Sequence, residues 1–223
     1  MNTKNLGMRL LCFAIGITLN AFGISLTTIG DLGTSSISSV PYVASLALPR
    51  ISFGLATFIW NVLFVATEIL LLRHRFHLVQ LLQLAACLLF ASMIDVGMAI
   101  FGFIHPVAIW QQLLCVFAGC VMLAFGIVIE VSPNLIMAPG EGIVRAFAIV
   151  TRGRYGTVKA FFDTTLIIMG AMLSLICFHA LRGVGIGTII SALIVGPIIN
   201  IINKAFRFPD RIRRLAPTET DAV

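Results

Sequence analysis

Six long apolar segments alternate with short polar connections along the chain. They lie at about 8–30, 53–73, 79–103, 108–131, 157–180 and 185–203. Each reaches the length of about 20 residues that a helix needs to cross a hydrocarbon layer about 30 Å thick. The pattern therefore predicts an all-α polytopic membrane protein with six transmembrane helices.

Two shorter apolar stretches lie between these segments, SSISSVPYVASLAL (35–48) and PGEGIVRAFAIV (139–150). Stretches of 12 to 14 residues are too short for a span and are typical of re-entrant or interfacial helices. Proline is well tolerated in the first turn of a helix, which suits the start of the second stretch. Glycine and proline residues at or near these stretches and in the last span are expected to act as structural breaks: Gly33, Pro139, Gly140, Gly142 and Pro197.

An internal repeat relates the two halves of the chain. The letters AFGI at 21–24 recur at 124–127, an offset of 103 that aligns Asp31 with Asn134. Farther along, GLATFIWN (54–61) aligns with GTVKAFFD (156–163) at an offset of 102. Asp95 aligns with Asn200 at an offset of 105.

Each half therefore reads as a long span, a short element and two more long spans. Because three crossings per half is an odd number, we expect two inverted three-span repeats, at about 8–103 and 108–203. Residues 1–204 would form a single membrane domain, followed at 205–223 by a basic and then polar cytoplasmic tail.

The basic residues predict the orientation. With six spans and both termini in the cytoplasm, 12 of the 15 Lys and Arg residues face the cytoplasm. Eight spans, with both short stretches crossing, would move the RHRFH loop at 73–77 outside. The positive-inside rule favours six spans.

Composition narrows the function classes. Hydrophobic residues make up 59% of the chain and charged residues 11%, whereas a soluble domain has roughly 25% charged residues. The net charge of +6 comes from basic residues at segment ends rather than from a patch suited to nucleic acid. The five cysteines lie in apolar segments without metal-ligand spacing. Metalloprotease, phosphate-loop and serine-nucleophile motifs are absent from the sequence. We therefore expect no catalytic residues, metal site, cofactor or nucleic-acid partner, and a lipid bilayer as the surroundings.

Ionisable residues in apolar segments cost a few kcal/mol each and mark candidate functional sites. Glu141 and Arg145 are four residues apart on the second short helix, with Glu141 in its first turn, where the helix dipole favours an anion. Ser35 and Ser36 lie near the start of the first short helix, a place suited to an anionic or polar group. We predict that these four residues bind substrate.

Three further polar residues lie within spans. Lys159 and Asp163 share one helix face and are expected to pair, either as a self-neutralising pair or in a substrate or proton role. Asn61 lies on a stripe with Gly54 and Glu68 that is expected to face the bundle. Two other carboxylates, Asp95 and Glu130, lie near span ends, where capping or snorkelling is the ordinary interpretation.

Three motifs carry a family resemblance: DLGTS (31–35), PGEG (139–142) and GIGTIISALIVGPIIN (185–200). With them the chain resembles the YczE/YyaS/YitT group of bacterial integral membrane proteins over about residues 8–204. It is most similar to the YczE-like members, because no soluble domain is expected after the last span. The resemblance implies a multi-pass protein of the bacterial cytoplasmic membrane and leaves its substrate undefined.

Two functions agree with these features. The first is a small secondary transporter, or a membrane substrate-binding subunit, for a small polar or anionic metabolite bound where the repeats meet. The alternative is a non-transporting accessory protein that binds a partner or assists export or assembly, with the basic segment at 204–214 as its contact surface. The partners expected are accordingly a small-molecule substrate, a second copy of the chain or another protein.

Overall fold

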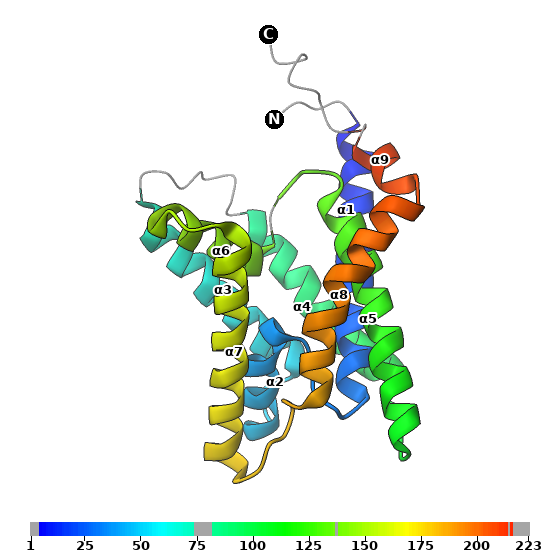
Figure 1. The fold of residues 1–223 in the computed structure, drawn as a ribbon, viewed down its shortest axis with the longest axis vertical. Helices are drawn as coiled ribbons and strands as arrows, with labels where there is room; N and C mark the ends of the chain where they lie inside the picture. Colours follow the sequence, from blue (N-terminus) through cyan, green and yellow to red (C-terminus); the bar gives the residue numbers. More distant parts are fainter. Residues whose placement is uncertain (1–4, 74–81, 137, 214, 216–223) are drawn as a thin grey trace.

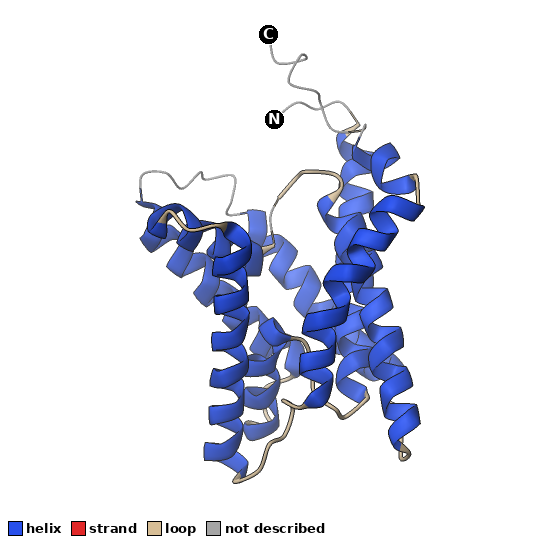
Figure 2. Ribbon diagram, viewed as in Figure 1, coloured by secondary structure: helices blue, strands red, loops and turns tan. Residues whose placement is uncertain are grey.

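The computed structural model of the chain is helical and describes residues 5–73, 82–136, 138–213 and 215 (Figures 1 and 2). Six of its helices are long and apolar enough to cross a membrane, as the sequence predicts. They are α1 (Leu6–Ile29), α3 (Phe53–Leu72), α4 (Leu82–Phe101), α5 (Ile109–Val131), α7 (Tyr155–Phe178) and α8 (Ile186–Ala205). The RHRFH loop beyond residue 73, the predicted start of the third span at 79–81 and the tail after residue 215 lie outside the described residues.

Two short helices, α2 (Ser36–Ala47) and α6 (Pro139–Thr151), stand where the short apolar stretches predict them. At 1.5 Å per residue they are about 18 and 20 Å long, less than the roughly 30 Å of a hydrocarbon layer. A last helix, α9 (Phe208–Arg213), was not predicted from the sequence. It packs on α5, where the ring of Phe208 stacks on the ring of Phe125 with 6.2 Å between centroids.

The two halves have the same order of elements and run in opposite directions (Figure 1). The first comprises α1 to α4 and the second α5 to α8. Helices α1 and α5 lie against each other and join the halves. Each short helix packs against a span of the other half, α2 on α7 and α6 on α3. Neither half is therefore a separate folding unit in its packing.

Close glycine contacts between α1 and α5 occur in pairs whose positions are related by the offset of 103. Gly16 of α1 lies against the backbone of Glu130 of α5, with no room for a Cβ atom. The residues equivalent to Gly16 and Glu130 in the other half are Gly119 (16 + 103) and Thr27 (130 − 103). Gly119 lies against the backbone of Thr27 in the same way. The repeat seen in the letters AFGI is thus also a repeat of contacts.

The turns that follow the two central helices match as well. Asp31 and Asn134, which the offset aligns, both have left-handed backbone, with φ of 57° and 49°. Asn and Asp are among the few residues that adopt this conformation readily. Gly33 follows in the first turn with φ of 112° and leaves no room for a Cβ beside Thr188 of α8.

A third matched contact joins each short helix to the opposite half. Gly142 of α6 faces the carboxylate of Glu68 of α3, and a Cβ there would lie 2.7 Å from Glu68 Oε2. In the equivalent place, Ser39 of α2 faces Gly170 of α7, where a Cβ would lie 2.9 Å from Ser39 Oγ. The glycine is on the short helix in the α6–α3 contact and on the span in the α2–α7 contact.

Candidate functional site

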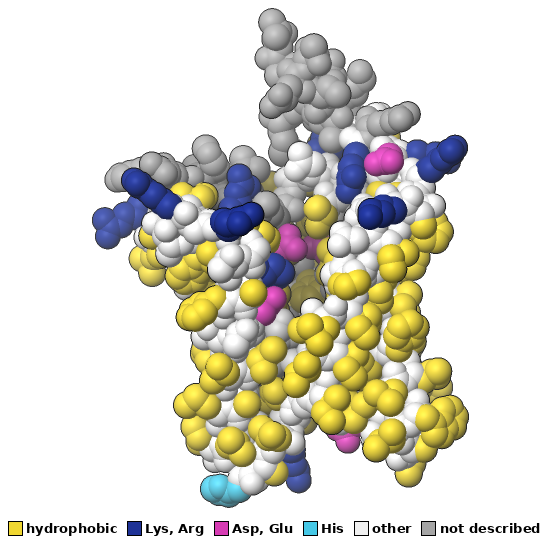
Figure 3. All heavy atoms as spheres, viewed as in Figure 1, with side chains coloured by type: hydrophobic (Ala, Val, Ile, Leu, Met, Phe, Trp, Pro, Cys, Tyr) yellow, Lys and Arg dark blue, Asp and Glu magenta, His cyan; other side chains and the backbone are white. Residues whose placement is uncertain are grey.

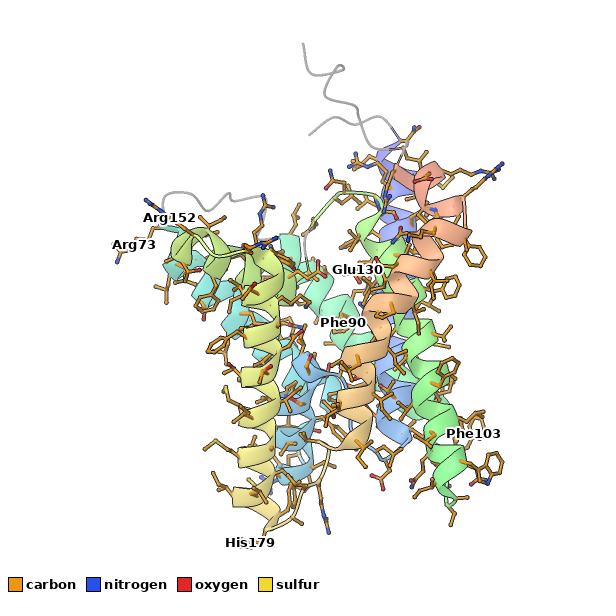
Figure 4. All side chains as sticks on the ribbon, viewed as in Figure 1. Arg73, Phe90, Phe103, Glu130, Arg152 and His179 are labelled. Atoms are coloured by element: carbon orange, nitrogen blue, oxygen red, sulfur yellow. The ribbon has the colours of Figure 1, made fainter. Side chains whose placement is uncertain are left out.

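A cavity of about 300 Å³ lies at the centre of the molecule, and all eight helices of the two repeats line it. The N-terminal turns of α2 and α6 meet there, and a Cβ at Gly140 of α6 would lie 3.0 Å from Ile37 Cδ1 of α2. Figure 3 shows acidic and basic side chains in the hollow between α7 and α8. Figure 4 places Glu130 and Phe90 at this hollow, on α5 and α4.

The structure brings six of the seven predicted substrate-binding residues together at this cavity. The six are Ser35, Ser36, Asn61, Glu141, Lys159 and Asp163. The seventh, Arg145, is exposed, is not among the lining residues and interacts electrostatically with Glu68 of α3. Four residues along a helix are a rise of about 6 Å, so Arg145 lies one turn farther from the cavity than Glu141.

The predicted structural breaks have different roles. Gly33 forms the turn before α2, and Pro139 is the first residue of α6, where its missing N–H costs no hydrogen bond. Gly140 and Gly142 are helical residues of α6 whose missing side chains admit Ile37 and Glu68, so they do not interrupt the helix. Pro197 lies inside α8, which continues to Ala205.

In the part of the chain that the structure describes, four charged side chains line the cavity, three carboxylates and one ammonium group. Lys159 Nζ lies 3.6 Å from Asp163 Oδ2, which confirms the predicted pairing on α7. The other two carboxylates, Glu130 and Glu141, form no ion pair within the described part of the chain. They are close enough to interact electrostatically with each other.

Glu130 was missed as a site residue because the sequence suggested only a capping or snorkelling role. Its side chain is 6% exposed and accepts a hydrogen bond of 2.8 Å at Oε2 from Asn20 Nδ2 of α1. The contact with Gly16 holds the backbone of Glu130 close to α1. Asn20, a polar residue in the middle of an apolar span, is the signal that could have pointed to this pair.

Several buried polar atoms at the cavity have no partner among the described residues. Asn61 is 5% exposed, lines the cavity and forms no side-chain hydrogen bond there. The indole Nε1 of Trp60 and the Oδ1 atom of Asp163 are likewise buried without a partner in that part of the chain. Buried polar groups are normally hydrogen-bonded, so these groups need a partner from outside the described residues.

The wall of the cavity is closed on one side by the α3–α4 contact. Asp95 of α4 accepts hydrogen bonds from the Gly54 N–H, at 2.7 Å, and from the Ser52 hydroxyl, at 2.6 Å. These residues precede and begin α3, so the carboxylate satisfies an otherwise unpaired N–H group at the helix start and caps it, as its position near a span end suggested.

The equivalent place in the second half is open, and we call it the α7–α8 gap. A Cβ at Gly156 would have no neighbouring atom within 4 Å, and Asn200 is exposed and makes no side-chain hydrogen bond to the described residues. Helices α7 and α8 hardly touch along their lengths, whereas α3 and α4 pack closely. In Figure 1, α7 and α8 are joined at the lower end and diverge toward the upper end.

The residues described by the structure contain no group of three or more His, Cys, Asp or Glu side chains that could hold a metal ion. Their free cysteines are separate, and Cys87 lines the cavity. The arrangement can therefore offer a ligand hydrogen bonds, charges and aromatic rings.

A protein-family model described as "Family of unknown function (DUF6198)" matches residues 7–204. No curated protein and no solved structure matches the chain. The matched region covers α1 to α8 almost completely and ends before α9.

Proposed function

The chain belongs to the DUF6198 family of unknown function, and we propose that it is a small secondary transporter for a polar metabolite. The observation that carries the proposal is the difference between two equivalent contacts around one polar cavity. The α3–α4 contact is closed, and the α7–α8 gap is open. Inverted repeats that adopt different conformations around a shared site are the basis of alternating access.

Alternating access requires that the two halves exchange their conformations. In the opposite state, α7 packs on α8, and the side-chain amide of Asn200 accepts a hydrogen bond from the Gly156 N–H. Asp95 then releases Gly54, and the α3–α4 contact opens. The aligned pairs Gly54 with Gly156 and Asp95 with Asn200 have the residue types that both states need, a glycine and a side-chain oxygen.

The orientation follows from the charges at the two ends. Arg73 and Arg152 lie at the same end of the molecule (Figure 4), and α9 with Arg211 and Arg213 lies at that end too. The loops at the other end contain Arg50 and Arg182. By the positive-inside rule the arginine-rich end faces the cytoplasm, so the α7–α8 gap opens to the cytoplasm. The resemblance to YczE-like proteins supports assignment to the bacterial cytoplasmic membrane.

The residues of the cavity have separate roles in this proposal. Glu141, Asn61 and the serines at 35 and 36 contact the substrate at the adjoining starts of α2 and α6. Lys159 and Asp163 form a charge pair on α7 that moves with the gap. Pairing keeps the cost of two charges in a membrane protein low while the cavity is without substrate.

Disulfide crosslinking tests the exchange without knowledge of the substrate. In a chain whose five cysteines are replaced, Ser52→Cys with Asp95→Cys reports on the α3–α4 contact, and Arg154→Cys with Asn200→Cys reports on the equivalent positions of the α7–α8 gap. Each double variant is oxidised in membrane vesicles. We expect both pairs to crosslink, because the protein visits both states.

A static protein gives a different result. If only the Ser52/Asp95 pair crosslinks, however long the oxidation, the transporter proposal is wrong. The accessory function, in which the protein binds a partner, then becomes the better account, because it needs no second state.

A further inference from the structure

We infer that the ligand of the central cavity is a small organic cation with an apolar body. The inference deepens the proposed function, because it assigns a substrate class to the same cavity. It takes the place of the expected small polar or anionic metabolite, which rested on the hydroxylated start of the first short helix and on Glu141 with Arg145. Three independent features of the cavity carry it: the balance of charges, the fixed position of one carboxylate, and the unpartnered and aromatic groups beside it.

The balance of charges favours a cation. Among the described residues Lys159 is the one basic side chain at the cavity, and it is already within 3.6 Å of Asp163. Glu130 and Glu141 remain without a cationic partner in the described residues, and they face the same space. Two carboxylates that share a site repel each other, and a positive group between them removes that cost.

Glu130 is held for such a contact. The hydrogen bond from Asn20 occupies one side-chain oxygen, Oε2, and leaves Oε1 without a hydrogen bond to the described residues. The backbone of Glu130 packs directly on Gly16. This contact holds α5 against α1 at this point and keeps the Glu130 side chain at the cavity. A buried carboxylate fixed in this way recognises an ammonium or guanidinium group strongly, since little entropy is lost on binding.

The remaining lining groups suit the rest of such a ligand. Trp60 and Phe90 present aromatic rings to the cavity, and aromatic faces attract cations and pack on apolar groups. Asn61 is buried, lines the cavity and has no hydrogen-bond partner among the described residues, so its amide oxygen can accept from an N–H group of the ligand. The geometry thus provides acceptors and rings around the two unpaired carboxylates.

Three probes with one apolar body and different charges test the inference: 2-phenylethylammonium, 2-phenylethanol and 3-phenylpropionate. Binding to the full chain in detergent is followed by the fluorescence of Trp60 in a Trp110→Phe background, since Trp110 is 65% exposed and outside the cavity lining. We expect the ammonium probe to bind about 30-fold or more tightly than the alcohol, with the carboxylate weakest. Equal or tighter binding of the carboxylate, or no binding of any probe, overturns the inference.

Variants locate the charge that is recognised. Glu130→Gln should weaken the ammonium probe about 30-fold and leave the alcohol unchanged, whereas Glu68→Gln, a buried carboxylate outside the cavity lining, should change neither. If Glu130→Gln fails to fold, binding of the three probes to the protein with Glu130 intact still tests the inference. If both cysteine pairs crosslink but the ammonium probe does not bind more tightly than the others, the transporter proposal stands and the organic-cation inference is wrong.

Discussion

Asn20 of α1 donates a hydrogen bond of 2.8 Å to Glu130 of α5, across the contact between the two halves. The offset of 103 aligns these residues with Leu123 and Thr27, so a leucine and a threonine stand at the equivalent positions of the second half. One side of the symmetric helix pair is therefore polar and the other is nearly apolar. The asymmetry places a carboxylate of α5, and none of α1, at the cavity.

Replacing Asn20 with leucine should destabilise the protein, because Glu130 then loses its hydrogen-bond donor while it remains buried. We expect the free energy of unfolding in mixed detergent to fall by about 1–3 kcal/mol. The double variant Asn20→Leu with Glu130→Thr has the residue types of the equivalent positions Leu123 and Thr27 and should recover most of this loss. A double variant no more stable than the single one would contradict the account.

The close approach of α1 and α5 should tolerate no added methyl group at Gly23. A Cβ there would lie 2.7 Å from Leu123 Cα and 2.9 Å from the Gly119 carbonyl oxygen, both backbone atoms. Gly23→Ala is expected to cost about 1–3 kcal/mol in a thermal or denaturant unfolding experiment. Gly7→Ala, on the same helix with nothing within 4 Å, is the matched control and should not destabilise.

Glu141→Gln should weaken binding of 2-phenylethylammonium about 10-fold or more, and Arg145→Ala should leave it within about twofold, because only Glu141 lines the cavity. Fluorescence titration of the purified variants measures both. Uptake into proteoliposomes should follow the same order while the Glu141 variant still elutes as a folded protein. Equal losses in the two variants would restore the original prediction that the residues act as a pair.

Removal of the cavity's ammonium group should strengthen cation binding. Lys159→Met leaves Asp163 as a third unpaired carboxylate, so we expect the dissociation constant of the ammonium probe to fall roughly threefold to tenfold. The effect should shrink at high salt, since both side chains are partly exposed. Lys204→Met, at the end of α8 and outside the cavity lining, serves as the control. Weaker binding in Lys159→Met would show that the lysine itself contacts the ligand.

Sequence patterns predicted the six spans and both short helices because hydropathy and length act locally. The end of a span is where apolar residues stop, so most of the predicted boundaries lie within three residues of the observed ones. The helix α9 was missed because it follows the apolar region, although Pro209 and Asp210 near its start are helix-start signals.

The candidate site was predictable only in part. Polar residues such as Asn61 and Asp163 stand out against an apolar background, and the structure brings them to one cavity. Arg145 followed from its spacing with Glu141, yet spacing along one helix does not say where the cavity ends. The pairing of Asn20 with Glu130 joins positions 110 residues apart, which no local pattern reveals.

At the contact between each short helix and a span, the glycine and its larger partner are exchanged between the halves. Each half is therefore shaped to pack against the other half and not against a second copy of itself. Two copies of the first half would set Glu68 against Ser39, too much volume for a site that holds one of them beside a glycine. Two copies of the second half would set Gly142 against Gly170 and leave a void. Each half therefore fits the other half better than it fits a second copy of itself. If the halves were expressed as separate polypeptides, they would therefore form a heterodimer in preference to homodimers.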